Sequence, residues 1–445
     1  MLWSRSGHLD RQELFGKIDA LAGRLPDRRY AINLCQERSS FMVGLMAALK
    51  RDQVVLLPPS RTIGVLRDLK VRFPDSHVMI DADARDIDSH EIAGPLSPLD
   101  LDELQAAGGT IPFEPKPDQV AVIAFTSGST GETQAHEKTW ESVNIGALLA
   151  AERFHLTEET GIVATVPPQH MYGIETSIFY PLIAGCSVHT SRPVLPTEIQ
   201  RALLDVASTK RLLITTPIHL KSLVRTNLEW PEIDAVISAT APLSAELAGL
   251  AERHLKAPVY EIYGCTEVGS IASRHTVASG VWQFYRGVEF SATDTEGRPM
   301  VLGGHVMKPT ALSDVLDPLS RSRFRLIGRA ADQVSIAGKR ASLGDLNAKL
   351  RAIDGVDDGV FIRRGNDDDG KVQRLACLFV STSLDERAVM TALRLVIDPA
   401  FLPRPIRRVD ELPYNELGKL PRQELLLRLD PDAMAGMAKT STSAA

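Results

Sequence analysis

The chain has 445 residues, of which 44% are hydrophobic and 24% charged, a composition typical of a globular protein with two or three domains. Its formal net charge of −6 gives no electrostatic reason to expect nucleic acid or an anionic membrane as the principal partner. The cysteines lie far apart without metal-ligand spacing, which favours a reducing compartment. No apolar run has the length of a membrane span or of a signal-peptide core, so we expect a cytoplasmic protein.

The first 80 residues alternate helical patterns with short apolar runs. Helical patterns cover residues 12–25 and 40–49, whereas residues 54–57 and 77–80 have the composition of strands. This alternation predicts an α/β fold with a mainly parallel sheet. Residues 81–117 are rich in Asp, Pro and Gly, and we expect them to form a surface connection.

An apolar run at residues 120–125 breaks abruptly into hydroxyls and glycines at Thr126-Ser-Gly-Ser-Thr-Gly131. Such a run suits a strand covered on both faces, and the two glycines allow the backbone to direct N–H groups at an anion. We therefore predict a buried strand that ends in a phosphate-binding loop. A plain Gly/Ser turn is the alternative. An ordinary P-loop NTPase is disfavoured, because Glu132-Thr133 occupies the place of the Walker Lys-Ser/Thr pair.

The following segment continues the α/β pattern. A helix is expected at residues 139–154 and another at 244–255, with strands at 161–168, 211–216, 235–238 and 258–262. Loops past the carboxyl ends of such strands converge on one crevice, where α/β sheets bind ligands. His170 lies in one of these loops and is either structural or a ligand contact.

The C-terminal part has a different organisation. Residues 323–329 alternate charged and apolar side chains, as a half-exposed strand does. From about residue 330 we expect a small α+β domain with strands at 333–336, 359–362 and 374–380 and helices at 344–353 and 384–397. Residues 403–408 form a stiff basic strip, and residues 431–445 have the composition of a disordered tail.

Four segments in order resemble the adenylate-forming superfamily of acyl-CoA synthetases, adenylation domains and luciferases. Thr126–Gly131 resembles its phosphate loop and Tyr263-Gly-Cys-Thr-Glu267 its adenylate segment, while residues 328–340 resemble its hinge and 417–422 its closing Gly-Lys segment. The resemblance implies an N-terminal domain at 1–328 that binds ATP and acid through mainly parallel sheets with flanking helices, and whose first subdomain is shortened. It also implies a mobile α+β domain at 329–430 that carries a catalytic lysine.

The resemblance also implies roles for individual residues. Lys419 would reach the carboxylate and the α-phosphate, Thr266 would contact a phosphate, and Glu267 would bind Mg²⁺, since a hard cation prefers carboxylate oxygen. Catalytic roles are thus expected for Lys419, Glu267, Thr266 and His170, an acid pocket at His170, Tyr172 and Gly173, and a hinge at Ala331. ATP contacts are expected from Thr126, Ser127, Gly128, Ser129, Thr130, Gly131, Thr240, Ala241, Pro242, Glu261, Tyr263, Gly264, Asp314, Arg329 and Arg340. Asp317 is the competing candidate for the ribose contact of Asp314.

Two departures from the family pattern stand out. Gln134 occupies the place of the loop lysine, whose role would fall to main-chain donors, to Lys138 or to no group. The hinge has Ala331 where Asp or Lys is common. Both affect the mechanism that the resemblance implies more than the fold.

The implied chemistry has two half-reactions that use ATP and Mg²⁺: a small carboxylic acid becomes an acyl-adenylate, and a thiol then takes the acyl group. Residues 128–140 resemble the short adenylating enzymes of aryl-polyene and xanthomonadin-type pigment pathways. That subgroup implies a hydroxybenzoate-like acid and an acyl carrier protein as partner. The alternatives are an acyl- or aryl-CoA ligase that uses free CoA, and a non-catalytic member that binds nucleotide or acyl ligand.

Overall fold

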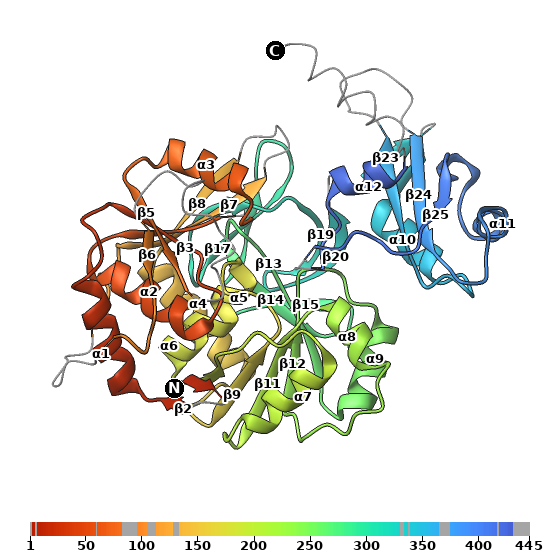
Figure 1. Ribbon diagram of the computed structural model, residues 1–445. Helices are drawn as coiled ribbons and strands as arrows, with labels where there is room; N and C mark the ends of the chain where they lie inside the picture. Colours follow the sequence, from red (N-terminus) through yellow and green to blue (C-terminus); the bar gives the residue numbers. More distant parts are fainter. Residues whose placement is uncertain are drawn as a thin grey trace, which may run out of the picture. The chain divides into compact units, whose positions relative to one another are not determined.

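A computed structural model describes residues 2–4, 7–58, 60–81, 96–104, 113–127, 133–329, 333–336, 339–364, 374–415 and 418–429 (Figure 1). The chain divides into two compact units. Unit 1 comprises Met1–Ala292, Met300–Thr310 and Leu319–Phe324, and unit 2 comprises Thr293–Pro299, Ala311–Pro318 and Arg325–Ala445. The expected domain boundary at 328 stays a prediction. The expected hinge at Ala331 and tail at 431–445 lie outside the described residues.

The first sheet of unit 1 has the order β6-β5-β3-β4-β7-β8, with bounds Leu96–Pro98, Ser76–Ile80, Tyr30–Asn33, Val54–Leu57, Val120–Ser127 and Thr133–Thr139. Neighbouring strands are parallel throughout the run β6-β5-β3-β4-β7, and β8 pairs antiparallel with β7. Helices α1 (Arg11–Ala22), α2 (Arg38–Lys50) and α3 (Ile63–Arg72) connect the early strands. The predicted strand at 120–125 is therefore confirmed. Three strands of this sheet were not predicted: β3, β6, which lies inside the expected connection, and the polar β8.

The second sheet of unit 1 has the order β15-β14-β13-β12-β11-β9-β10-β1-β2. Its bounds are Val281–Phe284, Gly269–His275, Val259–Cys265, Ala235–Ser238, Lys210–Thr215, Thr160–Ala164, Ser187–His189, Leu2–Ser4 and Gly7–Leu9. The strands β10, β9, β11, β12 and β13 run parallel, whereas β14 and β15 are antiparallel additions. Beyond β15 the order continues with the parts of β20 (Arg323–Arg329) and β19 (Asp314–Ser320) that belong to unit 1.

The helices of this sheet are α4 (Trp140–Phe154), α5 (Met171–Ile174), a π-helical turn at Glu175–Phe179, α6 (Tyr180–Ala184), α7 (Pro196–Asp205), α8 (Pro217–Leu223) and α9 (Ala245–Leu255). A buried core joins strand residues such as Val163, Leu213 and Val236 to helix residues such as Ile199 and Ala251. Figure 1 shows α8 and α9 in green beside this sheet. A small sheet, β16-β17-β18 (Glu289–Thr293, Pro299–Gly303, Val306–Ala311), follows in the chain.

Unit 2 contains the sheet β23-β24-β25 (Asp358–Arg364, Arg374–Val380, Ile406–Arg408) and the hairpin β21-β22 (Gln333–Ile336, Lys339–Ser342). The helices α10 (Leu343–Arg351), α11 (Glu386–Val396) and α12 (Arg422–Leu429) appear with it in cyan to blue (Figure 1). Because side chains alternate along a strand, Phe361 packs with one apolar cluster while Val360 and Ile362 pack with another. Both faces of this sheet are therefore covered.

The structure as a whole confirms the expected fold class, an α/β protein with a small α+β part.

Among the described residues, no helix is both long enough and apolar enough to cross a membrane.

Candidate active site

The three predicted acid-pocket residues lie together just after β9, at the carboxyl edge of the parallel strands. His170 is the residue before α5, and the Tyr172 hydroxyl lies 2.8 Å from Ile237 O and 3.1 Å from Thr215 O at the ends of β12 and β11. A Cβ atom at Gly173 would lie 1.9 Å from Pro167 O, so only glycine fits there. Burial raises the pKa of Tyr172 well above its usual value, so its phenol is a neutral hydrogen-bond donor.

Arg38 fixes the end of β9 that leads into this loop. Its side chain is fully buried, and its guanidinium donates hydrogen bonds to the carbonyl oxygens of Ala164, Val166 and Ser191. Burial, together with the charge of Arg192, lowers the pKa of Arg38 to about 9. No sequence pattern indicated this role, because an arginine in the first turn of a helix usually faces solvent.

The predicted adenine turn follows β12 and contains a strained residue. Thr240 has φ of +79°, a conformation in which a β-branched residue is a real outlier. Ala241 is half-buried and Pro242 is exposed, and the Leu243 N–H donates to Glu261 Oε1 at 3.2 Å. Strain of this kind costs about 1–3 kcal/mol and persists where the surroundings enforce it, often at ligand sites. The expected contacts of Thr240, Ala241 and Pro242 with ATP stay a prediction.

Glu261 on β13 anchors that turn from inside the sheet. Its second oxygen accepts hydrogen bonds from Arg274 Nε at 2.7 Å and from Thr276 Oγ1 at 3.0 Å, and the carboxylate is nearly buried. Burial raises the pKa of this carboxyl, although the charge and hydrogen bonds of Arg274 oppose the shift. Each carboxylate oxygen thus accepts a hydrogen bond from the protein itself. A direct contact of Glu261 with ATP stays a prediction.

The predicted adenylate segment forms the end of β13 and the turn into β14. Tyr263 packs in an aromatic cluster, with its ring centroid 5.7 Å from that of Trp282 and 5.4 Å from that of Phe324. The β13–β14 register shifts between Tyr263 and Gly264, and a Cβ at Gly264 would lie 2.1 Å from Gly269 O. Such a bulge redirects the chain. It presents Thr266 and Glu267 in the connecting turn rather than in the sheet.

Glu267 is half-buried in that turn and carries a negative charge at neutral pH. Partial burial raises the pKa of its carboxyl. A hydrogen bond from Cys265, its own backbone N–H and the charges of His136 and Lys138 outweigh this effect, so the pKa lies below its usual value. The described residues contain no group of three or more His, Cys, Asp or Glu that could enclose a metal. A single anionic carboxylate fits Mg²⁺, which takes its other ligands from phosphates and water.

Unit 2 holds four predicted site residues, Asp314, Arg329, Arg340 and Lys419. Asp314 is half-buried at the start of β19, and Asp317 Oδ2 lies 3.5 Å from Arg325 Nη1. The backbones of Arg329 and Arg340 lie in β20 and β22, but their side chains are outside the described part of the structure.

Lys419 is exposed and follows Gly418, whose φ is +68°. Its N–H donates to Asn415 Oδ1 at 2.9 Å, and Asn415 N–H donates back to Lys419 O at 2.8 Å. These two hydrogen bonds fix the backbone of Lys419 beside that of Asn415.

Residues 41–313 match the family described as AMP-binding enzyme. The chain belongs to this family. The expected membership of the adenylate-forming superfamily is thereby confirmed, and adenylate-forming enzymes use ATP and Mg²⁺.

Individual relatives are distant. Bacitracin synthase 1 of Bacillus licheniformis is 24% identical over 92% of this chain, which spans only 8% of that protein. The 2-succinylbenzoate–CoA ligase of Staphylococcus aureus is 23% identical over 69% of this chain and 67% of its own length. The structure of Bacillus subtilis O-succinylbenzoate coenzyme A synthetase with ATP and magnesium ion superposes with a TM-score of 0.77 at 18% identity, covering 93% of each chain. This likeness establishes the fold.

The loop that should hold the phosphates lies only partly within the described residues. Thr126 and Ser127 end β7, whereas Gly128, Ser129, Thr130 and Gly131 lie outside. Gln134, in the place of the usual lysine of adenylate-forming enzymes, pairs with Thr126 across β7 and β8 and is exposed. Lys138 is buried, and its Nζ donates to Glu267 O. The structure therefore places Lys138 at the Glu267 turn, a position that the sequence did not reveal.

Proposed function

We propose that this enzyme adenylates an aromatic, hydroxybenzoate-like carboxylic acid and transfers the acyl group to the phosphopantetheine thiol of an acyl carrier protein. One observation supports the adenylation most. The loop of His170, the strained turn at Thr240 and the turn of Glu267 follow β9, β12 and β13, which run parallel in one sheet. The residues that we expect to contact the acid, the adenine and the metal therefore lie at the same edge of this sheet, where α/β sheets bind ligands.

The chain supplies positioning and charge rather than a nucleophile. In the first step a carboxylate oxygen of the acid bonds to the α-phosphorus of ATP while the bond to pyrophosphate breaks, and Lys419 would stabilise the charge that develops there. In the second step the thiol sulfur attacks the acyl carbon, AMP leaves and the thiol proton is released. Glu267 would hold Mg²⁺, which neutralises charge on the phosphates.

The expected result of a substrate panel tests this proposal directly. With ATP and Mg²⁺, pyrophosphate release should depend on the added acid and should be fastest with hydroxybenzoate-like acids among aryl, fatty and dicarboxylic acids. The measurement is a coupled pyrophosphate assay with an acid-free control. Folded protein that binds ATP but releases no pyrophosphate with any acid would favour the non-catalytic, ligand-binding reading.

The second part of the proposal is that the thiol which accepts the acyl group belongs to an acyl carrier protein. Arg404, Arg407 and Arg408 are exposed, and the last two lie on β25 at the edge of its sheet in unit 2. Lys339 of the same unit is already paired with Asp398 at 2.6 Å. An acidic carrier protein would be attracted to such a basic edge, and the attraction would chiefly raise its association rate.

Loading of holo carrier protein should be faster than thioester formation with CoA and should slow as salt is added, because screening weakens the attraction. Arg407→Glu/Arg408→Glu should slow carrier loading and leave CoA turnover unchanged. The matched control, Lys256→Glu/Lys308→Glu, makes the same charge change at exposed sites of unit 1. Faster reaction with CoA, or carrier loading that ignores both salt and the reversal, would instead support an acyl- or aryl-CoA ligase.

A further inference from the structure

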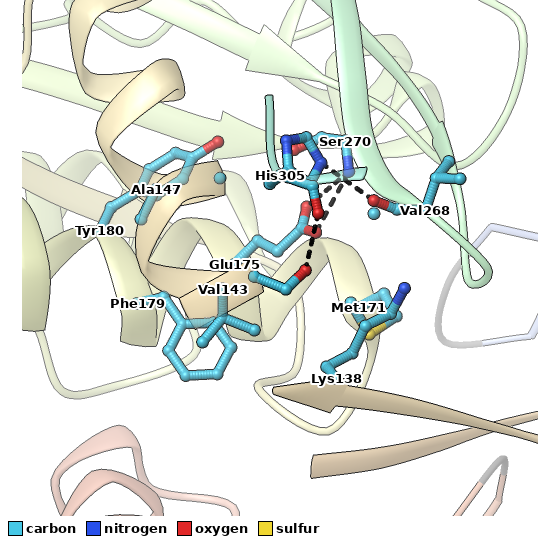
Figure 2. A pocket seen from close by; sticks show the side chains of 13 residues that line it. Lys138, Val143, Ala147, Met171, Glu175, Phe179, Tyr180, Val268, Ser270 and His305 are labelled. Carbon is cyan, nitrogen blue, oxygen red and sulfur yellow. Dashed lines mark hydrogen bonds between the residues drawn. The ribbon is translucent and has the colours of Figure 1, made fainter. Parts of the chain in front are cut away.

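Three side chains from separate elements hold the segment that contains Glu267. Lys138 at the end of β8 donates from Nζ to Glu267 O, and His305 between β17 and β18 contacts Val268 O from Nε2 at 2.9 Å. Glu175, the first residue of the π-helical turn, accepts the Ser270 N–H at 3.1 and 3.2 Å through its two oxygens. Figure 2 shows Glu175 and His305 hydrogen-bonded to Ser270 and Val268, with Lys138 in the same pocket.

His305 acts here as a fixed neutral donor. Burial lowers its pKa to about 4, so the ring is uncharged at neutral pH. Because Nε2 faces the carbonyl oxygen of Val268, that nitrogen carries the ring proton. The backbone oxygen of His305 accepts a hydrogen bond from Ser142 Oγ at 3.0 Å, which ties the histidine to α4.

The backbone at Gly269 and Ser270 leaves room for the carboxylate of Glu175. Gly269 has φ of +77°, and a Cβ there would lie 2.4 Å from Glu175 Oε1. The glycine therefore lets the carboxylate reach the backbone N–H of Ser270. Lys138, Glu175 and His305 also line a small cavity of about 20 Å³, which has room for about one water molecule (Figure 2). The turn of Glu267 thus rests on a packed polar support with little free space.

We propose that Lys138 and His305 are positioning residues for the carboxylate of Glu267, and that they set the affinity of the site for Mg²⁺ with ATP. The inference rests on the proposed function, which assigns Glu267 to the metal. A carboxylate at the tip of a turn is held only as well as its backbone, and turn tips are ordinarily the mobile part of a hairpin. Here two consecutive carbonyl groups, of Glu267 and Val268, accept hydrogen bonds from buried side chains.

Lys138 and His305 hold this carboxylate through the backbone of its own turn. A residue that orients a metal ligand in this way typically contributes a factor of about 10–100 to metal affinity or activity. The buried ammonium of Lys138 therefore holds the turn of Glu267, to which we assign the metal. The chain thus has a lysine at this turn, although Gln134 occupies the place of the usual lysine of the phosphate loop.

The test measures ATP binding by calorimetry with Mg²⁺ and again with the metal chelated. The wild-type protein should bind ATP more tightly with Mg²⁺. Lys138→Met, which keeps the length of the side chain without its charge, should reduce this gain by about tenfold or more. His305→Leu should do the same, whereas His305→Gln should retain most of the gain because its amide nitrogen can still donate to Val268 O. Lys308→Met, at an exposed site, is the matched control.

Thermal unfolding of each variant separates positioning from general destabilisation, and only folded variants are compared. The affinity for Mg²⁺-free ATP should change little in them. A folded Lys138→Met protein with the full wild-type gain from Mg²⁺ would overturn the proposal, as would a wild-type protein with no gain. If the protein does not adenylate an acid, acid-dependent pyrophosphate release will be absent in the separate pyrophosphate assay. The comparison of ATP binding with and without Mg²⁺ can still be made in that case.

Discussion

Replacing Lys419 with alanine should slow acid-dependent pyrophosphate release by about 10²–10³, the usual loss when one charge stabiliser is removed from a site of developing negative charge. Two hydrogen bonds with Asn415 fix the backbone of Lys419, and the residue is exposed. Removal of the side chain leaves those backbone hydrogen bonds in place. The loss should therefore be chemical and not structural.

Both half-reactions must be measured to interpret this variant. Transfer from chemically supplied acyl-adenylate to the thiol should survive in Lys419→Ala, because we expect the lysine to serve only the first step. Lys349→Ala, an exposed lysine paired with Asp345 at 2.9 Å on α10 of the same unit, is the control and should change neither rate. Equal losses in both steps would contradict the assigned role.

The sequence predicted the fold where local pattern and tertiary environment agree. The apolar run before Thr126 became β7, buried between β4 and β8, and the repeated strand and helix patterns from residue 139 to 262 became the parallel part of the second sheet. The polar β8 was missed because Thr133–Thr139 lacks an apolar run. Its strand conformation depends on pairing with β7, and a tertiary contact of that kind leaves little local signal.

The sequence predicted only those parts of the candidate site that belong to recognisable motifs. Glycine positions such as Gly173 and Gly264 agree with close backbone approaches of 1.9 and 2.1 Å that nothing larger would allow. The supporting residues were not found: Arg38, Glu175 and His305 come from distant segments and act through backbone groups. Arginine and glutamate are ordinarily assigned to the surface, and histidine is intermediate between surface and core. Only the folded chain reveals which backbone atoms they reach.

Loss of the cation beside Glu261 should give the largest change in stability. Arg274→Met removes the partner of a carboxylate whose side chain is 5% exposed, and breaking a buried pair in this way costs about 3–5 kcal/mol. The free energy of unfolding from urea titrations measures the change. Arg286→Met is the matched control, because its pair with Glu152 has side chains that are 77% and 51% exposed and should contribute at most about 1 kcal/mol.

The loss in Arg274→Met should also depend on pH, in a direction that identifies Glu261 as its cause. Burial already raises the pKa of the Glu261 carboxyl, and without Arg274 the folded-state pKa rises further above the unfolded value of about 4.3. A group of this kind favours the folded state most when it is protonated, and that contribution is lost as pH rises through the folded pKa. The variant should therefore lose stability, relative to wild type, as pH rises from about 4.

Adding Glu261→Gln to Arg274→Met should remove this pH dependence, because glutamine cannot ionise but still offers an oxygen to the Leu243 N–H. The double variant should also be more stable at pH 8 than Arg274→Met alone, since no unpaired charge remains buried. A deficit in Arg274→Met that is the same at pH 5 and pH 8, and that Glu261→Gln does not relieve, would show that the arginine acts through its packing. That packing is visible in its position 4.6 Å from the Trp282 ring centroid.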